Sequence, residues 1–453
     1  MNGILLTILT AIAVLDIVTW VFIIVIERKD VNKACAWIVI TIILPVIGAV
    51  GYFVIGQRIW LYSLYRGRKV SGSCSPSEEL PDVLSFLKDS EGTDCTHGNR
   101  TEFFSDGKEM FDRMSADIKN AEKSVRIEFY IILNDKLGGP VLDLLAEKAS
   151  EGLDVALICD GFGCRKLSKE TKRKLEESGV KVVMFNEPGL PYLNPVMNNR
   201  DHRKIVIIDG RICYCGGFNL CIDYVGQGHV GHWRDSAVRI EGPAAPMMER
   251  RFANTCGYCG VDISETDNET SSGGDDTVVT VYGGPDMRPN PIMELHLHLI
   301  RNAKESILLQ TPYFMNREMI EAVKDASRSG IKITLILPGK IDHWFTFWNN
   351  YSCARLLKDT DVDIRLYQNG FMHSKTMIVD DSICIVGSSN FDDRTAYYNF
   401  ETTAAIISDD CLESMKEAFH KDLEDSVPMV FSDYSGLIPL IKRMVSGVIR
   451  CLG

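Results

Sequence analysis

The 453-residue chain contains two segments of similar sequence, and this internal repeat limits the possible fold more than any other feature. The first segment includes NAEKSVRIEFYII (120–132) and LDVALICDG (153–161), and the second includes NAKESILLQTPYF (302–314) and IKITLILPG (331–339). In both segments, short apolar runs typical of strands alternate with amphipathic stretches typical of helices. The sequence therefore predicts a duplicated domain with α/β layers in each half.

Each half ends in the same polar motif, at residues 202–219 and 373–390. Counted from the first histidine, Lys is at +2, Asp at +7 and Asn at +17, which gives His202, Lys204, Asp209 and Asn219 in one half and His373, Lys375, Asp380 and Asn390 in the other. Side chains two positions apart on a strand share a face, so we expect each His–Lys pair on one face of a strand. The apolar run that follows predicts a buried strand with the aspartate in the turn at its end.

These residue types suit the cleavage of a phosphodiester. The reaction needs a nucleophile, a proton donor for the leaving oxygen and positive charge near phosphorus, and two His–Lys pairs supply all three without metal or other cofactor. A carboxylate from each half would orient the imidazoles, and Asp235 and Glu401, each expected in the strand after its motif, suit this supporting role. Asp209 and Asp380 belong to the catalytic motif, but we expect them to shape turns and the contact between lobes.

The first 56 residues predict a membrane hairpin. Residues 3–26 contain one charge, Asp16, and at about 1.5 Å per residue they reach about 36 Å, enough to cross a hydrocarbon core of ~30 Å. A second apolar run, 34–55, contains Pro45 and two glycines, which transmembrane helices tolerate. We therefore expect two transmembrane helices in a cell-membrane protein. A cleaved signal peptide is disfavoured because no Lys or Arg precedes the first run.

The orientation of this hairpin rests on a small charge difference. Three basic residues lie in the loop between the runs (Arg28, Lys29 and Lys33), and four follow the second run (Arg58, Arg66, Arg68 and Lys69). This bias predicts a cytoplasmic catalytic domain, as do 14 cysteines without a disulfide spacing. Asp16 is either functional or a contact between helices, and the sequence leaves both readings open.

Composition sets the expected domain boundaries. We expect a linker at 57–98, the first lobe at 99–260, an acidic linker at 261–277, the second lobe at 278–430 and an amphipathic helix at 431–453. The last helix could lie on an anionic membrane or pack on the lobes. The aromatic cluster of Trp344, Phe345, Phe347 and Trp348 equally fits a lipid interface or a core.

The cysteine spacing and the net charge argue against a metal site and against a nucleic-acid-binding protein. Cys256 and Cys259 form a lone CxxC pair without a second ligand pair, so we expect no metal site there. The formal net charge of −12 disfavours a protein whose main task is to bind nucleic acid, because such proteins usually carry a basic surplus.

The paired motifs resemble the phospholipase D superfamily, whose members carry two HKD motifs, and more narrowly the bacterial cardiolipin synthases of that superfamily. The resemblance covers nearly the whole chain, including RDHRKIVIIDG, GGFNL, WRDSAVRIEGPA, TPYF, MHSKTMIVDD, GSSNFDDRT and NFE. The N-terminal hairpin, WRD and SNFDDR narrow it to the synthases. The resemblance implies two α/β/α lobes with both motifs at one shared active site.

The resemblance also implies a reaction without cofactor. One phosphatidylglycerol would transfer its phosphatidyl group to a histidine and release glycerol, and a second phosphatidylglycerol would accept the group to form cardiolipin. By analogy His202 is the nucleophile and His373 the general acid and then base, although the near-symmetry of the motifs leaves the reverse order open. Lys204, Lys375, Asn219 and Asn390 would bind the phosphate oxygens.

Two other functions compete with this one. A hydrolase of the same superfamily would cleave phospholipid head groups or nucleic acid, and the N-terminal hairpin and the acidic net charge argue against a nuclease. A non-catalytic membrane scaffold would not need both motifs, and both are intact. The sequence therefore favours the phosphatidyl transferase, with phosphatidylglycerol and cardiolipin as membrane partners.

Overall fold

The structure is a computed structural model that describes residues 2–27, 31–56, 80–88, 90, 92–187, 198–228, 230–267, 273–340 and 342–431, with positions 436, 439, 441, 442, 445 and 446. Most of the expected C-terminal helix (431–453) and much of the expected linker at 57–98 therefore lie outside the described residues.

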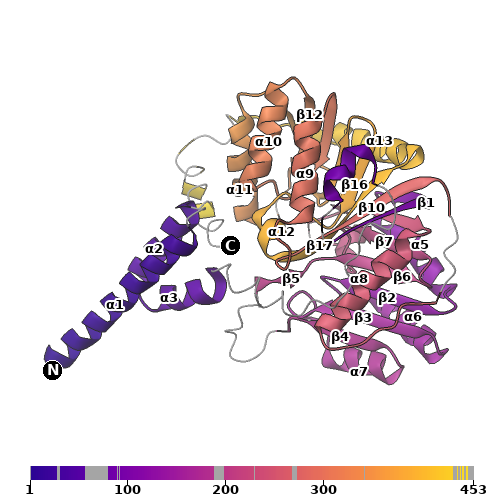
Figure 1. The fold of residues 1–453 in the computed structure, drawn as a ribbon, viewed down its shortest axis with the longest axis horizontal. Helices are drawn as coiled ribbons and strands as arrows, with labels where there is room; N and C mark the ends of the chain where they lie inside the picture. The colour runs from indigo at the N-terminus through magenta and orange to yellow at the C-terminus, as the bar shows by residue number, and fades with distance from the viewer. Residues whose placement is uncertain are drawn as a thin grey trace.

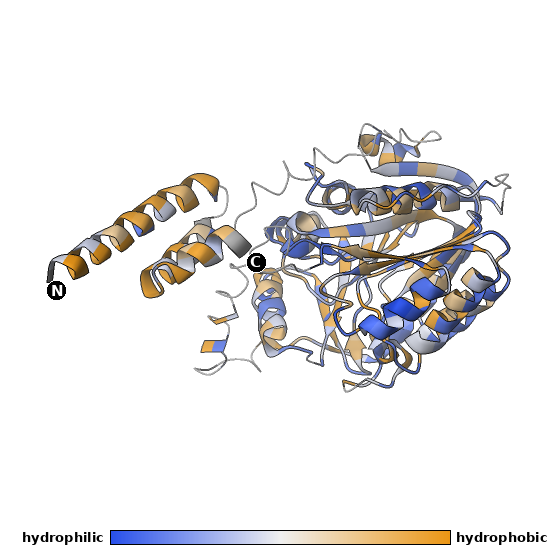
Figure 2. Ribbon diagram, turned by 90° about the horizontal axis from the view of Figure 1, so that it is seen from below, coloured by the Kyte–Doolittle hydropathy of each residue, from blue (hydrophilic) through white to orange (hydrophobic). Residues whose placement is uncertain are grey.

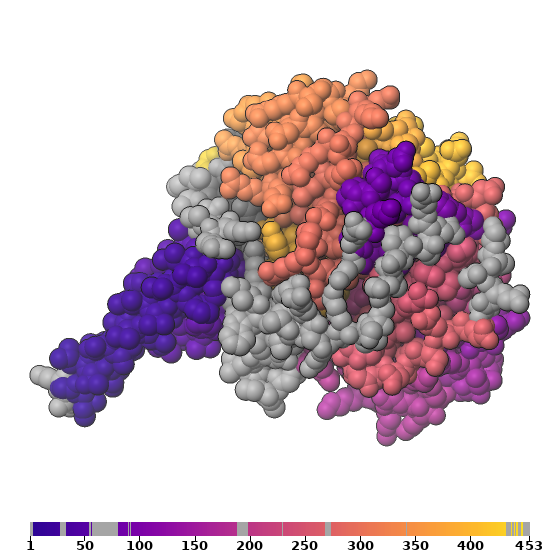
Figure 3. All heavy atoms as spheres, viewed as in Figure 1, coloured from indigo at the N-terminus to yellow at the C-terminus, as the bar shows by residue number. Residues whose placement is uncertain are grey.

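The N-terminal helices project from one side of the body (Figures 1 and 3). They are α1 (Asn2–Ile26), α2 (Val31–Ile43), α3 (Ile47–Gly51) and the π-helical turn η1 (Tyr52–Gly56). In the described part of the chain, α1 is the only helix long and apolar enough to cross a membrane, and Figure 2 shows that most residues of the N-terminal helices are hydrophobic. With 13 residues, α2 spans only about 20 Å. Within the described residues, the structure therefore supports one of the two predicted transmembrane helices, α1, and the second is not confirmed.

A reversal of the chain at Pro45 explains this difference. Proline lacks an N–H and its ring clashes with the preceding turn, which kinks or breaks a helix, and here α2 ends at Ile43, two residues before it. The next residue, Val46, has φ 64, and α3 then returns along α2. Gly48 permits the close approach, because a Cβ there would lie 2.8 Å from the Thr41 Cα. The hydroxyl of Tyr52 donates to Glu27 Oε1 at 3.4 Å, so the chain returns to the level at which α1 ends.

The first lobe alternates strands and helices as the repeat predicts. Its elements are β1 (Thr93–Phe104), α5 (Gly107–Lys119), β2 (Ser124–Phe129), α6 (Gly138–Ser150), β3 (Asp154–Asp160), α7 (Lys169–Glu177), β4 (Lys181–Phe185), β5 (Arg200–Asp201), β6 (Lys204–Ile208), β7 (Ile212–Gly216), the 3-10 turn η4 (Ile222–Val225), β8 (Trp233–Arg234), β9 (Ala237–Glu241) and α8 (Ala244–Tyr258). The strand β1 begins inside the segment expected to be linker. A 3-10 turn before it, η2 (Asp82–Leu87), packs on the second lobe.

The second lobe repeats this order. Its elements are β10 (Asp276–Gly283), α9 (Pro291–Asn302), β11 (Ser306–Gln310), α10 (Arg317–Arg328), β12 (Lys332–Pro338), α11 (Trp344–Ala354), η5 (Arg355–Leu357), β13 (Asp363–Tyr367), β14 (Phe371–Met372), β15 (Thr376–Val379), β16 (Ile383–Gly387), α12 (Asp393–Tyr397), β17 (Asn399–Ile407), α13 (Asp409–Glu424) and β18 (Ser426–Pro428). The helices begin at residues suited to capping. Asn290 accepts from backbone N–H groups at the start of α9, and Asn316 does so for α10.

The two lobes share one continuous sheet. Its order within the described residues is β18-β13-β12-β11-β15-β16-β17-β10-β1-β9-β7-β6-β2-β3-β4. The halves mirror each other about the antiparallel pair β1–β10, in which Thr93 opposes Val281. In each half the motif strand, β6 or β15, runs antiparallel to a strand, β2 or β11, that itself pairs in parallel with the next. The prediction of a duplicated α/β domain is confirmed.

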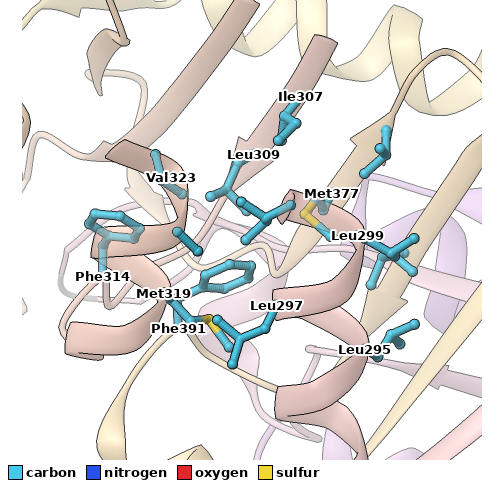
Figure 4. Packing of buried hydrophobic residues seen from close by; sticks show 14 of the residues in the cluster. Leu295, Leu297, Leu299, Ile307, Leu309, Phe314, Met319, Val323, Met377 and Phe391 are labelled. Carbon is cyan, nitrogen blue, oxygen red and sulfur yellow. The ribbon is translucent and has the colours of Figure 1, made fainter. Parts of the chain in front are cut away.

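Each lobe has its own hydrophobic core on the outer face of the sheet. In the second lobe, one buried cluster joins Leu295 and Leu299 of α9, Ile307 and Leu309 of β11, and Met319 of α10, which lies close to Phe391 (Figure 4). Burial of each such side chain contributes about 1.5–3 kcal/mol, so this layer fixes the strands that carry the second motif. On the other face, α8 and α13 cover strands from both lobes.

Candidate active site

Both histidines lie in short breaks just before a strand. His202 follows β5 and precedes β6, and His373 follows β14 and precedes β15. We expected each His–Lys pair to lie on one strand, and this is wrong, because regular pairing begins only at Lys204 and Thr376. The apolar runs that follow are fully buried strands, as predicted.

Exchanged strand pairs place the histidines at the lobe interface. The two-residue strand β5 of the first lobe pairs with β17 of the second, and the His202 N–H donates to the Phe400 carbonyl at 2.9 Å. In the other direction, β14 of the second lobe pairs with β8 of the first, and the His373 N–H donates to the Arg234 carbonyl at 2.8 Å. Each histidine is thus fixed by backbone from the opposite lobe.

The supporting carboxylates cross between the lobes in the same way. Glu401, in β17 of the second lobe, lies 2.9 Å from Nδ1 of His202 in the first lobe. Asp235 of the first lobe lies 2.5 Å from Nδ1 of His373 in the second. The sequence analysis expected Asp235 within a strand, but it occupies the gap between β8 and β9. Both carboxylate side chains are fully buried.

The motif aspartates have a different environment from the other site residues. Asp209 and Asp380 lie in turns with φ 55 and φ 51, at the ends of β6 and β15. The Asp209 carboxylate accepts the backbone N–H groups of residues 122–124, and that of Asp380 accepts those of residues 304–306. Each aspartate therefore ties the motif turn to the first residues of the neighbouring strand, β2 or β11.

The lysines bring positive charge into this buried site. Lys204 Nζ donates to the His202 carbonyl at 2.5 Å and lies 5.5 Å from the centre of the Tyr130 ring. Lys375 Nζ lies 2.7 Å from His373 Nδ1 and 3.5 Å from Asp235 Oδ2. Burial lowers the pKa of Lys204 to about 7 and that of Lys375 to about 8, because a buried ammonium loses its hydration.

The imidazoles respond to the same surroundings. Burial lowers the pKa of His202, and Glu401 opposes this effect. Burial, followed by the charge of Lys375, lowers the pKa of His373 to about 4. Both lysines lower the pKa of both histidines, so the protonation of each histidine depends on the charge of both lysines. For Asp235, burial alone would raise the pKa, but Lys375 and His373 outweigh burial and lower it.

The two motif asparagines lie in unlike surroundings. Asn219 Oδ1 accepts the backbone N–H of Ile131 at 3.2 Å, and its Nδ2 donates to the Tyr224 hydroxyl at 2.7 Å. Asn390 Oδ1 is buried and has no partner among the described residues. The sequence analysis gave the two asparagines the same task, and their contacts differ.

Several residues at the site were missed by the sequence analysis. Ser388 donates to Glu401 Oε2 at 2.5 Å, whereas its counterpart Gly217 leaves room for Asp235, since a Cβ there would lie 2.0 Å from Asp235 Oδ1. The Gly-to-Ser difference between the motifs was the available signal. Tyr224 lies 3.3 Å from His373 Nδ1 through its hydroxyl and is also fully buried. It lies five residues after Asn219, a spacing the sequence displays but does not explain.

The remaining features of the sequence analysis are the possible metal ligands, the aromatic cluster and Asp16. Within the described ranges, no set of three or more His, Cys, Asp or Glu side chains is placed to hold a metal ion. The aromatic cluster is split, because Trp344 is 46% exposed whereas Phe347 and Trp348 are buried. Asp16 is buried within the N-terminal helices, and its Oδ1 has no partner in the part of the chain that the structure describes.

A shared, buried site with two histidines, two lysines and crossed carboxylates holds the groups that phosphodiester chemistry needs. Comparison with known proteins narrows this class. The family "Cardiolipin synthase, PLD-like domain" matches residues 114–253 and 296–423, and the family "Phospholipase_D-nuclease N-terminal" matches residues 8–57. The chain belongs to the cardiolipin synthase family of phospholipase D-like proteins, which confirms the resemblance seen in the sequence.

Individual relatives agree with this assignment. The chain is 32% identical to cardiolipin synthase 2 of Staphylococcus epidermidis, over 97% of this chain and 96% of that protein. It is 33% identical to a cardiolipin synthase of Staphylococcus aureus, over 91% of this chain and 89% of that protein.

Solved structures support the fold alone. A phosphatidylserine synthase from Haemophilus influenzae matches with a TM-score of 0.62 at 14% identity, over 78% of this chain and 95% of that chain. A polyphosphate kinase from Porphyromonas gingivalis matches with a TM-score of 0.52 at 13% identity, over 77% of this chain and 53% of that chain.

Proposed function

We propose that this protein is a cardiolipin synthase that transfers a phosphatidyl group from one phosphatidylglycerol to another and releases glycerol. The observation that carries the proposal is the pair of crossed contacts, Glu401 to His202 and Asp235 to His373, within one buried cationic site. Its relatives of nearly equal length are named cardiolipin synthases.

In the first step, His202 attacks phosphorus and the bond to the glycerol oxygen breaks. Glu401 contacts Nδ1 of His202 and holds a proton there, which leaves the Nε2 lone pair for attack. His373 gives its Nε2 proton to the departing glycerol oxygen, and Asp235 at Nδ1 stabilises its charged form. The products of this half-reaction are glycerol and a phosphatidyl group bound to His202.

In the second step, the hydroxyl of another phosphatidylglycerol attacks the same phosphorus. His373, now neutral, takes the hydroxyl proton, and the phosphorus–nitrogen bond to His202 breaks. Cardiolipin leaves and both histidines return to their starting protonation states. Water in place of the lipid hydroxyl would give phosphatidic acid, the product of the alternative hydrolase.

Charge explains why the empty site holds its imidazoles neutral. Two lysines and burial lower the histidine pKa values, and a bound phosphodiester reverses part of this effect because it is an anion. Lys204 and Lys375 are the cations for the phosphate oxygens. Binding of the anionic substrate thus favours the protonated, charged form of His373, which is the general acid.

We also propose that α1 crosses the cell membrane once and that the catalytic lobes face the cytoplasm. The helix α2 contacts the second lobe near its first turn, where Lys33 Nζ donates to the Tyr398 hydroxyl at 2.9 Å. Tyr398 comes directly before β17, the strand that carries Glu401. This contact holds the site close to the membrane surface that its lipid substrates occupy.

The test is the product formed in phosphatidylglycerol liposomes, followed by mass spectrometry with a chelator present. Full-length protein should form cardiolipin and glycerol, and His202→Ala and His373→Ala should not. His420→Ala, which changes an exposed histidine on α13, should retain activity. Phosphatidic acid in place of cardiolipin would establish the hydrolase, and activity in the two site variants would exclude histidine chemistry.

A further inference from the structure

The N-terminal helices meet the second lobe through a buried cluster of charged and aromatic side chains. Lys33, in the first turn of α2, is 1% exposed, and its Nζ donates to the hydroxyl of the fully buried Tyr398. Glu27, directly after α1, lies 3.5 Å from the same Nζ and accepts the Tyr52 hydroxyl. An ammonium withdrawn from water needs such partners, because burial removes its hydration. The contact is therefore a buried interface between the helices and the lobe.

Tyr398 lies three residues before Glu401, the carboxylate that contacts His202. Three residues of extended chain span only about 10 Å, so little chain separates the interface from the site. The residue after Tyr398, Asn399, donates from Nδ2 to Glu401 Oε1 at 3.1 Å. The position of Glu401 therefore depends on the junction between α12 and β17, and Lys33 holds this junction from outside the lobe.

The same junction also holds the chain that leads to His202. Arg394 of α12 lies 5.7 Å from the centre of the Tyr398 ring, and its carbonyl accepts the Tyr398 N–H at 2.9 Å. The Arg394 guanidinium donates to both the side-chain and the backbone oxygen of Asn198, each at 2.9 Å. Asn198 lies four residues before His202, just ahead of β5. The junction thus supports both the histidine and its carboxylate.

The other half of the site draws support from within the lobes. Asp235 is preceded by Arg234, whose guanidinium pairs with Asp422 of α13 at 2.7 Å. Arg234 also donates to the Ser236 hydroxyl at 3.0 Å, and this hydroxyl lies 2.8 Å from that of Ser374 in the second motif. Loss of the contact with the N-terminal helices should therefore weaken the nucleophile half of the site before the acid–base half.

We propose that Lys33 is a positioning residue: through its contact with Tyr398 it holds the α12–β17 junction in the geometry that the nucleophile half needs for attack on phosphorus. The inference rests on the proposed function, because it takes His202 as the nucleophile and Glu401 as its support. It goes beyond anchoring, since an anchor sets how readily lipid reaches the site, whereas a positioning residue sets how fast bound lipid reacts.

The first test separates anchoring from positioning, with the full-length protein in phosphatidylglycerol liposomes. Lys33→Met keeps the length of the side chain and removes the ammonium. We expect kcat for glycerol release to fall about 10-fold while KM and the liposome-bound fraction stay unchanged, because a small misplacement of a reacting group slows the chemical step. Lys33→Arg keeps the charge and should recover part of the loss. Lys169→Met, at an exposed lysine that begins α7, is the matched control.

The second test measures the nucleophile half alone. A phosphatidyl ester of p-nitrophenol has a leaving group that needs no acid, so the burst of nitrophenolate reports attack by His202. The burst should be slower than wild type in Lys33→Met and in Tyr398→Phe, which removes the hydroxyl that Lys33 contacts. The double variant should lose no more than either single one, because both act through one contact.

Unchanged kcat or an unchanged burst in Lys33→Met would overturn the proposal, as would additive losses in the double variant. A higher KM or a smaller liposome-bound fraction with normal kcat would leave Lys33 as part of the anchor alone. A lower melting temperature with normal kcat would assign it a purely structural role. Glycerol is released in transfer and in hydrolysis alike, so phosphatidic acid in place of cardiolipin would refute the proposed function while the Lys33 result would still stand.

Discussion

Glu401 of the second lobe lies 2.9 Å from His202 of the first, although 199 positions separate them in the chain. The reciprocal contact, Asp235 to His373, crosses in the other direction. Because each histidine depends on the opposite lobe for its carboxylate and for a backbone hydrogen bond, neither lobe contains a complete site. The duplication therefore produced an enzyme whose chemistry exists only at the interface between its halves.

The crossed carboxylates give the first prediction. Glu401→Gln and Asp235→Asn keep the shape of each side chain but remove the charge that fixes the imidazole tautomer. We expect each to lower kcat by about 100-fold or more, as for other carboxylate-supported histidines. Initial rates of cardiolipin formation measure the effect, with Glu417→Gln on the exposed side of α13 as the control. Near-normal turnover in either site variant would mean that the crossed contacts are only structural.

The Gly217–Ser388 difference gives the second prediction. A methyl group at Gly217 would collide with Asp235, because its Cβ would lie 2.0 Å from Oδ1. We expect Gly217→Ala to displace Asp235, to cost about 1–3 kcal/mol in the free energy of unfolding and to abolish most turnover. Ser388→Ala only removes a hydrogen bond to Glu401, so its loss of turnover should be smaller. Denaturant unfolding and lipid turnover together test this order, and the reverse order would refute it.

The pKa of His373 gives the third prediction. Its folded value of about 4 lies below its ordinary 6.5, so the unfolded chain takes up the proton first as pH falls. Stability is therefore complete above pH 6.5 and is lost as pH falls toward 4, by about 3 kcal/mol from this group. The free energy of unfolding should fall more steeply over this range in the wild type than in His373→Gln. Parallel curves for the two proteins would contradict the prediction.

The N-terminal helices give the fourth prediction. The proposed single crossing by α1, with the second apolar run returning at Pro45, would place the start of α1 and the catalytic lobes on opposite faces of the membrane. An epitope tag placed ahead of Gly3 should be digested by protease added to the outside of intact spheroplasts. A tag inserted in the exposed loop at Gly152, in the first lobe, should be protected. Equal protection of both tags would require two crossings.

The sequence predicted the duplicated α/β fold and the residues of the site because both depend on local patterns repeated along the chain. It could not predict that Glu401 serves His202, because the exchange depends on two-residue strands between lobes, which have no periodicity to detect. Hydropathy also counted residues 34–55 as one span, since it averages over the turn at Pro45.

The most direct test of the central claim is to trap the phosphatidyl group on His202. A phosphatidyl ester of p-nitrophenol needs no acid for its leaving group, so His373→Ala should still be able to accept the phosphatidyl group but not pass it on. We predict a burst of nitrophenolate and a phosphatidyl adduct on the peptide that contains His202, found by mass spectrometry, and no adduct in His202→Ala. An adduct on His373 in His202→Ala, with none in His373→Ala, would reverse the two roles and contradict the account.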